Sequence, residues 1–167
     1  ATATANITDN DAATAALSVT TQGDETGPVA IVYTVTLSQV NNTGSAITFD
    51  IASSGGSATS GADYTAIPGG AQISVANGAA TGTYTVTVTN DALLEATETV
   101  QATISNSSNP AVSISTASAT ANILDNETAT VTLTANDNAA SETGVNPGQF
   151  TVDLGTVNNT GAAITVN

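Results

Sequence analysis

The sequence predicts an all-β protein, with the fold of an immunoglobulin-like antiparallel β-sandwich of about seven strands. Runs of alternating apolar and polar residues recur along the 167-residue chain, each bounded by Asn, Asp, Gly or Pro. The runs follow one another every 10 to 20 residues or so, as short strands of a sandwich do. No helical pattern exceeds a turn or two, and no apolar run is long enough to cross a bilayer.

The individual strands are placed by this alternation. It is clearest in TGTYTVTVTN, where Tyr84, Val86 and Val88 face one side and the intervening threonines face the other. AIVYTVTLS and SAITFDIAS have the same pattern. A long Gly/Ser loop at 53–64 and a polar turn at 106–111 interrupt it. The seven strands are expected at 14–21, 29–38, 45–52, 71–76, 82–90, 98–105 and 116–124.

Composition restricts the possible functions. The chain has 14 acidic residues, no Lys, Arg or His, and a formal charge of −14. Nucleic acids and anionic membranes need basic patches, so we expect neither as a partner. Without His or Cys, the only metal ligands are hard oxygens, which favour Ca²⁺ or Mg²⁺. Paired carboxylates can hydrolyse glycosides, but five aromatic residues offer little to stack sugars on, so we expect no enzyme.

The sequence also repeats itself. ATATANITDND matches ASATANILDNE, DETG matches SETG, and VNNTGSAIT matches VNNTGAAIT, with a period of 116 to 117 residues. This period suits a β-sandwich domain and is too long for a solenoid repeat. We therefore expect the end of one repeat at 1–11, a complete repeat at 12–127 and the first part of another at 128–167. The chain is then a segment of a longer tandem array.

The segment TNDALLEATET concentrates negative charge. Its acids Asp91, Glu95 and Glu98 are four and three residues apart. Two carboxylates about 5 Å apart repel by about 3 kcal/mol at an effective dielectric constant near 20. With no base to pair with, such groups must be solvated, hydrogen-bonded to backbone N–H, protonated or bound to a cation.

Three segments together carry a family resemblance. SATSGADYTAI, VTVTNDALLEATETV and ATANILDNE resemble the Calx-beta domain, whose pattern includes a Gly-x-Asp-Tyr element, an acidic loop and a terminal run of acids. The resemblance covers 12–127 and recurs in both partial ends. It implies that acids from several loops bind Ca²⁺ at one end of the sandwich. The ligands implied are Glu25, Asp63, Asp91, Glu95, Glu98, Asp125 and Glu127.

The chain departs from the family pattern in the acidic loops. Asn90 and Asn126 stand where the family usually has Asp, and Glu127 replaces another Asp. Asn offers an oxygen at lower charge, so the expectation is fewer ions or weaker binding. The alternative interpretation is that these acids are ordinary turn residues that bond nearby backbone N–H groups.

The order of the strands supports a shared site. Loops after the first, third, fifth and seventh strands point to the same end of a sandwich, and they hold Glu25, Asp63, Asp91 and Asp125. A cation there would tie four loops together where one repeat meets the next. Asp9 and Asp11 would then belong to the preceding repeat's site and Glu142 to the following one. Three further acids, Asp50, Asp137 and Asp153, are expected to be solvated.

Two functions from different classes follow. The first is a structural repeat of a long secreted or cell-surface protein, a stalk, fibre or sheath, as in the bacterial surface arrays of the family. Its partners would be neighbouring repeats or copies of the same protein, joined in a filament through strand edges or loops. Without Lys or Arg the chain offers no trypsin-type cleavage site, which suits an extracellular location. The alternative is an adhesin module that binds a glycan or protein ligand directly.

Overall fold

The computed structural model describes residues 1–6 and 10–167, and strands dominate this part of the chain. None of the described residues forms a helix that is long and apolar enough to span a membrane. The strands are β1 (Ala13–Thr21), β2 (Gly23–Asp24), β3 (Ile31–Leu37), β4 (Ile47–Gly55), β5 (Gln72–Val75), β6 (Thr81–Val86), β7 (Glu98–Ser105), β8 (Val112–Thr116), β9 (Ser118–Leu124), β10 (Thr132–Asp137) and β11 (Gln149–Asp153).

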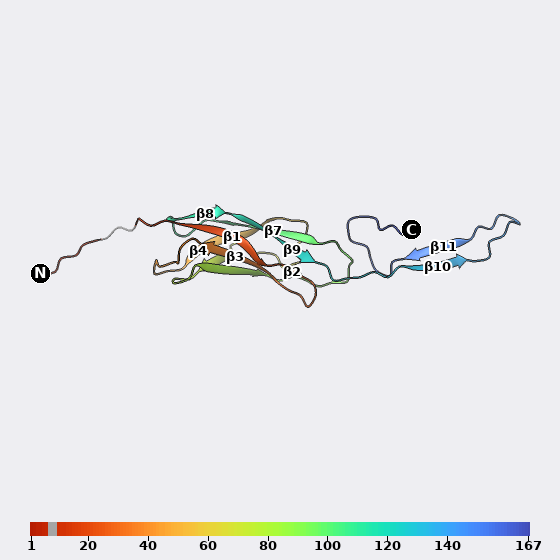
Figure 1. The fold of residues 1–167 in the computed structure, drawn as a ribbon, viewed down its shortest axis with the longest axis horizontal. Helices are drawn as coiled ribbons and strands as arrows, with labels where there is room; N and C mark the ends of the chain where they lie inside the picture. Colours follow the sequence, from red (N-terminus) through yellow and green to blue (C-terminus); the bar gives the residue numbers. More distant parts are fainter. Residues whose placement is uncertain (7–9) are drawn as a thin grey trace.

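Strands β1 to β9 form a two-sheet sandwich, which confirms the predicted fold (Figure 1). One sheet has the order β6-β3-β1-β8 and the other β2-β9-β7-β4-β5. Most neighbours are antiparallel, but β1 pairs with β8 and β2 pairs with β9 in parallel. The first and last parts of the repeat are thereby paired in both sheets.

The core lies between the sheets and is built from the alternating apolar residues of both. In β6 and the segment after it, Val86 and Val88 are buried while Thr85, Thr87 and Thr89 are exposed, as the sequence predicts. Tyr33 crosses the core, and its hydroxyl donates a hydrogen bond of 2.7 Å to the Val100 carbonyl in the opposite sheet. Among the described residues, every fully buried apolar residue lies between Ala15 and Ile123, so this span contains a complete core.

The structure differs from the prediction near the end of the repeat. The expected strand 116–124 begins at Ser118, while residues 112–116 form β8 on the other sheet. The expected strand 82–90 ends at Val86, and beyond it Val88 makes only an isolated bridge with Tyr64. The short β2 is a further strand that the sequence did not predict.

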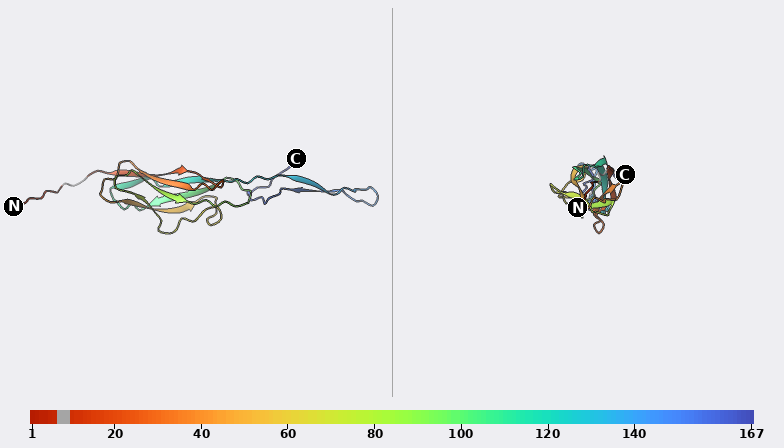
Figure 2. Two further views of the ribbon diagram at one scale, coloured as in Figure 1. Left: turned by 90° about the horizontal axis from the view of Figure 1, so that it is seen from below. Right: turned by 90° about the vertical axis from the view of Figure 1, so that its left-hand side faces the viewer.

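Strands β10 and β11 form a separate two-stranded antiparallel sheet beyond one end of the sandwich. Two views at right angles show the hairpin continuing the long axis of the sandwich (Figures 1 and 2). The segment after the hairpin turns back to the sandwich, where Asn158 pairs with Leu94 in an isolated parallel bridge. Asn158, which follows the hairpin in the sequence, thus contacts the acidic loop of the sandwich that precedes the hairpin.

Candidate metal centre

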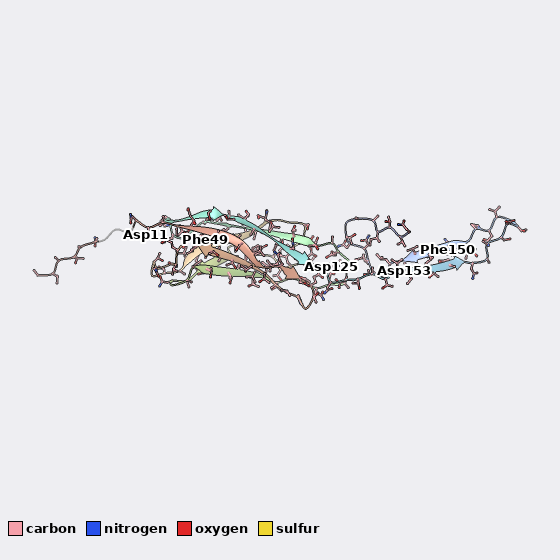
Figure 3. All side chains as sticks on the ribbon, viewed as in Figure 1. Asp11, Phe49, Asp125, Phe150 and Asp153 are labelled. Carbon is pink, nitrogen blue, oxygen red and sulfur yellow. The ribbon has the colours of Figure 1, made fainter. Side chains whose placement is uncertain are left out.

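All seven acids predicted as ligands come together at the end of the sandwich that faces the hairpin. They come from four places in the fold: the β2–β3 connection, the β4–β5 loop, the β6–β7 loop with the start of β7, and the segment after β9. Asp125 marks this end and Asp11 marks the opposite end (Figure 3). The strand order therefore brings these loops to one end of the sandwich, as expected from the sequence.

The side chains form two overlapping groups that could hold a metal ion. In one, carboxylate oxygens of Glu25, Glu95 and Asp125 all lie within 4.8 Å of one another. In the other, the same limit holds for Asp63, Glu95 and Glu98. Glu95 belongs to both groups, so it joins the two halves of the cluster.

Asp63 is held in place by its own loop. One carboxylate oxygen, Oδ2, accepts a hydrogen bond from the backbone N–H of Thr59, and the Asp63 carbonyl accepts one of 2.9 Å from the Thr89 N–H. The neighbouring Tyr64 is buried in the core. The Asp-Tyr element thus anchors a buried carboxylate beside the acidic loop.

Three buried oxygens of the cluster lack hydrogen-bond partners among the described residues. They are Oε2 of Glu25, Oδ1 of Asp125 and Oε2 of Glu127. Glu25 is only 2% exposed, although it lies in the β2–β3 connection at the end of the sandwich. Buried polar atoms in native proteins are almost always satisfied by protein, water or an ion. Since the chain has no basic side chain, a cation from solution is the partner that would also neutralise the charge.

Burial and repulsion favour protonation of these carboxyls when no cation is bound. Burial, with smaller contributions from Asp91 and Asp125, raises the pKa of Glu25 to about 7, although a backbone hydrogen bond from Asp91 opposes the shift. The pKa of Glu98 is also raised to about 7, first by burial and then by a hydrogen bond shared with Asp63. Desolvation likewise raises the pKa of Glu127.

The acidic loop contains one ordinary turn contact and one amide pair. Oδ1 of the exposed Asp91 accepts a hydrogen bond of 2.7 Å from the Leu93 N–H, which is the arrangement of an Asx turn. Asn126 donates its amide to Oδ1 of Asn90 at 2.8 Å. Two of the three positions at which the chain departs from the family pattern are therefore hydrogen-bonded to each other.

The other acids lie away from this cluster or in local turns. Asp50 accepts hydrogen bonds from Gln72 and Asn106, which lower its pKa. Oδ1 of Asp137 and of Asp153 each accepts a bond from the backbone two residues on, as turn residues do. Asp9, which the repeat assigns to a preceding site, lies outside the described residues.

Sequence reasoning missed two residues that contact the cluster. Leu94 exchanges backbone hydrogen bonds with the returning chain, its N–H donating to the Val157 carbonyl and its carbonyl accepting from Asn159. The Asn159 side chain also donates to Oε1 of Glu95, the acid shared by both groups. The pair Leu93 and Leu94 could have indicated this contact. A fully solvated acidic loop has no need of two adjacent apolar side chains.

Comparison with known proteins agrees with this arrangement of strands and loops. The family model of the Calx-beta domain matches residues 8–127. Comparison with curated proteins finds no match.

Solved structures of similar fold include the apo form of the Calx CBD1 domain, at 18% identity and a TM-score of 0.55, with 70% of this chain and 100% of that chain covered. The calcium binding domain CBD12 of CALX1.1 has a TM-score of 0.52 at 18% identity, covering 66% of this chain and 44% of that one. CBD12 from CALX1.2 has a TM-score of 0.54 at 15% identity, covering 86% and 70%. The chain belongs to the Calx-beta domain family.

Proposed function

We propose that this chain is a segment of a tandem array of calcium-stabilised β-sandwich repeats in a secreted or cell-surface protein. The observation that carries the proposal is the set of partnerless buried oxygens on Glu25, Asp125 and Glu127, in a chain without a single basic side chain. Calcium at the acidic end of each repeat then fixes the loops and the linker to the next repeat. The proposal involves no catalytic step.

The donor set fits calcium. Ca²⁺ takes six to eight oxygen ligands at about 2.3–2.6 Å, with flexible geometry, whereas Mg²⁺ demands a near-ideal octahedron. The two groups offer five carboxylates, with Asp91 and Glu127 beside them. The Asn90–Asn126 amide pair takes the place of two charged ligands in the family pattern. We therefore propose fewer ions than the family's full set, with Glu95 bridging the two groups. The calcium binding domain CBD12 of CALX1.1 shares this fold.

The hairpin supports the tandem arrangement. Leu133 pairs with Val152 in β10 and β11, as Leu17 pairs with Val35 in β1 and β3. With offsets of 116 and 117 residues, these pairs occupy equivalent positions in the sequence repeat. Both strand pairs also shift register at the same relative place, after Val19 in one and after Ala135 in the other. The hairpin thus reproduces the first strand pair of the sandwich.

The same equivalence bears on the adhesin alternative. Phe150 and Leu133 are each 67% exposed and would be the natural candidates for an adhesive patch. Their equivalents Tyr33 and Leu17 are buried in the core of the complete repeat. We therefore assign the exposed residues to the core of a following repeat, and we favour the structural role over direct ligand binding.

The proposed location rests on chemistry that suits the outside of a cell. Calcium sites of extracellular modules bind with dissociation constants of about 10⁻⁴ to 10⁻³ M. A repeat with lowered ligand charge is suited to that range. The absence of Lys and Arg also removes every trypsin-type cleavage site from the chain.

Isothermal titration calorimetry on the metal-free 1–167 chain tests the proposal. We expect saturable calcium binding with a dissociation constant at or below about 1 mM, and weaker magnesium binding. Glu95→Gln keeps the shape but removes a charged ligand from both groups, so it should weaken binding at least about tenfold. Glu142→Gln, in the β10–β11 turn, makes the same chemical change away from the cluster and should leave binding unchanged.

The calorimetric result would contradict the proposal in two ways. No binding up to about 10 mM calcium would mean that the acids are solvated turn residues. Equal loss of affinity in the Glu95→Gln and Glu142→Gln variants would mean that binding depends on net charge and not on the cluster.

A further inference from the structure

The joint between the complete repeat and the following segment has a defined set of contacts. The Leu94 N–H donates to the Val157 carbonyl at 3.2 Å, and the Asn159 N–H donates to the Leu94 carbonyl at 2.8 Å. The Thr156 hydroxyl donates to the Ala92 carbonyl at 3.3 Å. Together with the Asn159 amide on Glu95, these bonds hold the acidic loop against the segment 156–159.

This segment belongs to a turn that occurs twice in the chain. The Asn158 amide donates to the Ala162 carbonyl at 2.8 Å, and Oδ1 of Asn158 accepts from the backbone N–H and hydroxyl of Thr160. In the complete repeat, Asn41 bonds in the same way to the Ser45 carbonyl and to Thr43. The Val-Asn-Asn-Thr-Gly turn at 40–44 therefore has the same local structure as the turn at 157–161.

The turn at 40–44 borders a cavity of about 180 Å³ at the other end of the sandwich, where Figure 3 labels Asp11. Its lining is mixed, with the apolar residues Leu37, Ile47 and Val112 beside polar residues such as Gln39 and Asn109. Val40 lies at its edge and is 51% exposed.

The sequence repeat relates this cavity to the acidic cluster. Asp11, which also lines the cavity, is the equivalent of Glu127 in the sequence repeat. The cavity therefore adjoins the residue that the repeat assigns to the metal cluster of a preceding copy. At the joint seen in this chain, the acidic loop is held by the equivalent turn.

We infer that this cavity is the docking site for the acidic loop of the preceding repeat. The inference rests on the tandem arrangement proposed above. In this chain the Val157 carbonyl accepts a hydrogen bond from the Leu94 N–H, and the Asn159 N–H donates one to the Leu94 carbonyl. The inference assigns the same two backbone hydrogen bonds to Val40 and Asn42, with the equivalent leucine of the preceding repeat. The incoming loop places its leucine pair against the apolar residues that line the cavity, and the Asn42 amide meets the glutamate equivalent to Glu95. The lining offers neutral amides, one acid (Asp11) and no basic group, so recognition depends on hydrogen bonds and apolar contact rather than on ion pairing.

Amide hydrogen exchange measured by NMR on two copies of residues 12–127 joined in tandem tests the inference. This span contains a complete core, so each copy can fold alone. We expect the Leu94 amide of the first copy and the Asn42 amide of the second to exchange at least about tenfold more slowly than in a single copy. The protection of Leu94 should match that of Leu94 in the 1–167 chain.

A blocking variant and its control locate the contact. Ala111→Trp in the second copy fills the cavity from an exposed position, and it should restore fast exchange at Leu94 of the first copy. Ala117→Trp introduces the same side chain at an exposed alanine that does not line the cavity, and it should leave the protection intact. Equal exchange in the pair and the single copy, or protection that survives Ala111→Trp, would overturn the inference.

The experiment separates this inference from the calcium proposal. Protection is measured in metal-free buffer and again with calcium, alongside calcium binding by a single copy. Protection without any calcium binding would leave the docking site standing and remove the metal site. Calcium binding by a single copy without protection in the pair would keep the metal site and refute the docking site.

Discussion

Without divalent metal ions, the chain should be more stable at about pH 5 than at about pH 7.5. The pKa values of Glu25 and Glu98 are raised from 4.5 to about 7 in the folded chain. Between these two values the folded state binds more protons than the unfolded state, so the free energy of unfolding falls as pH rises. The shift of Glu25 corresponds to a loss on the order of 3 kcal/mol, and the partly exposed Glu98 adds less because solvent screens it.

Thermal unfolding followed by circular dichroism in metal-free buffers measures this effect. For a domain of this size, each kcal/mol corresponds to a change of roughly 2 to 8 °C in the midpoint. Glu25→Gln cannot ionise, so its midpoint should change less across the same pH range. A midpoint in the unsubstituted chain that stays level or rises from about pH 5 to 7 would contradict the raised pKa values. The lowered pKa of Asp50 acts only below its ordinary value of 3.8, outside this window.

Calcium should reverse the loss of stability at neutral pH. Binding only to the folded state at about a hundred times the dissociation constant stabilises by about 2.7 kcal/mol, a rise of several degrees in the unfolding midpoint. The rise should shrink toward pH 5, because protons and calcium compete for the same carboxylates. Thermal unfolding with calcium and with excess chelator gives the comparison at each pH.

The Glu25→Gln variant makes the calcium prediction sharper. Without calcium at neutral pH, it should be more stable than the unsubstituted chain because it removes a buried charge from the repelling cluster. With calcium it should gain less, because it lacks a charged ligand from one of the two groups. The variant should therefore be the more stable protein without calcium and the less stable one with calcium. Equal gains in both proteins would show that Glu25 does not contribute to calcium binding.

Much of the fold could be predicted because local alternation decides it. In β4 and β7 the buried residues are the alternating apolar ones, so the period of two located each strand within a few residues. The strand β8 was missed because VSIST has only two apolar residues, Val112 and Ile114, which are out of phase with the alternating run that begins at Ala117. Only parallel pairing with β1, about 100 residues away, decides that the chain changes sheets near Ala117.

The acids of the site could be predicted because few other roles were open to them. In a chain without a base, carboxylates on loops at one end of a sandwich need a common partner. The family resemblance then named the residues, and the structure brings all seven together. Which of them contact one another could not be predicted, since burial of Glu25 and sharing of Glu95 depend on loop conformation. The Leu94–Asn158 pairing lies between segments more than sixty residues apart, so no local pattern encodes it.

The claim that these acids hold calcium is tested most directly by anomalous X-ray scattering from crystals of the 1–167 chain grown with calcium. We expect an anomalous difference peak within about 2.3–2.6 Å of carboxylate oxygens of Glu25, Glu95 and Asp125. A second peak among Asp63, Glu95 and Glu98 would show that both groups are filled. A map with no peak at this end of the sandwich, at calcium concentrations well above 1 mM or so, would contradict the account.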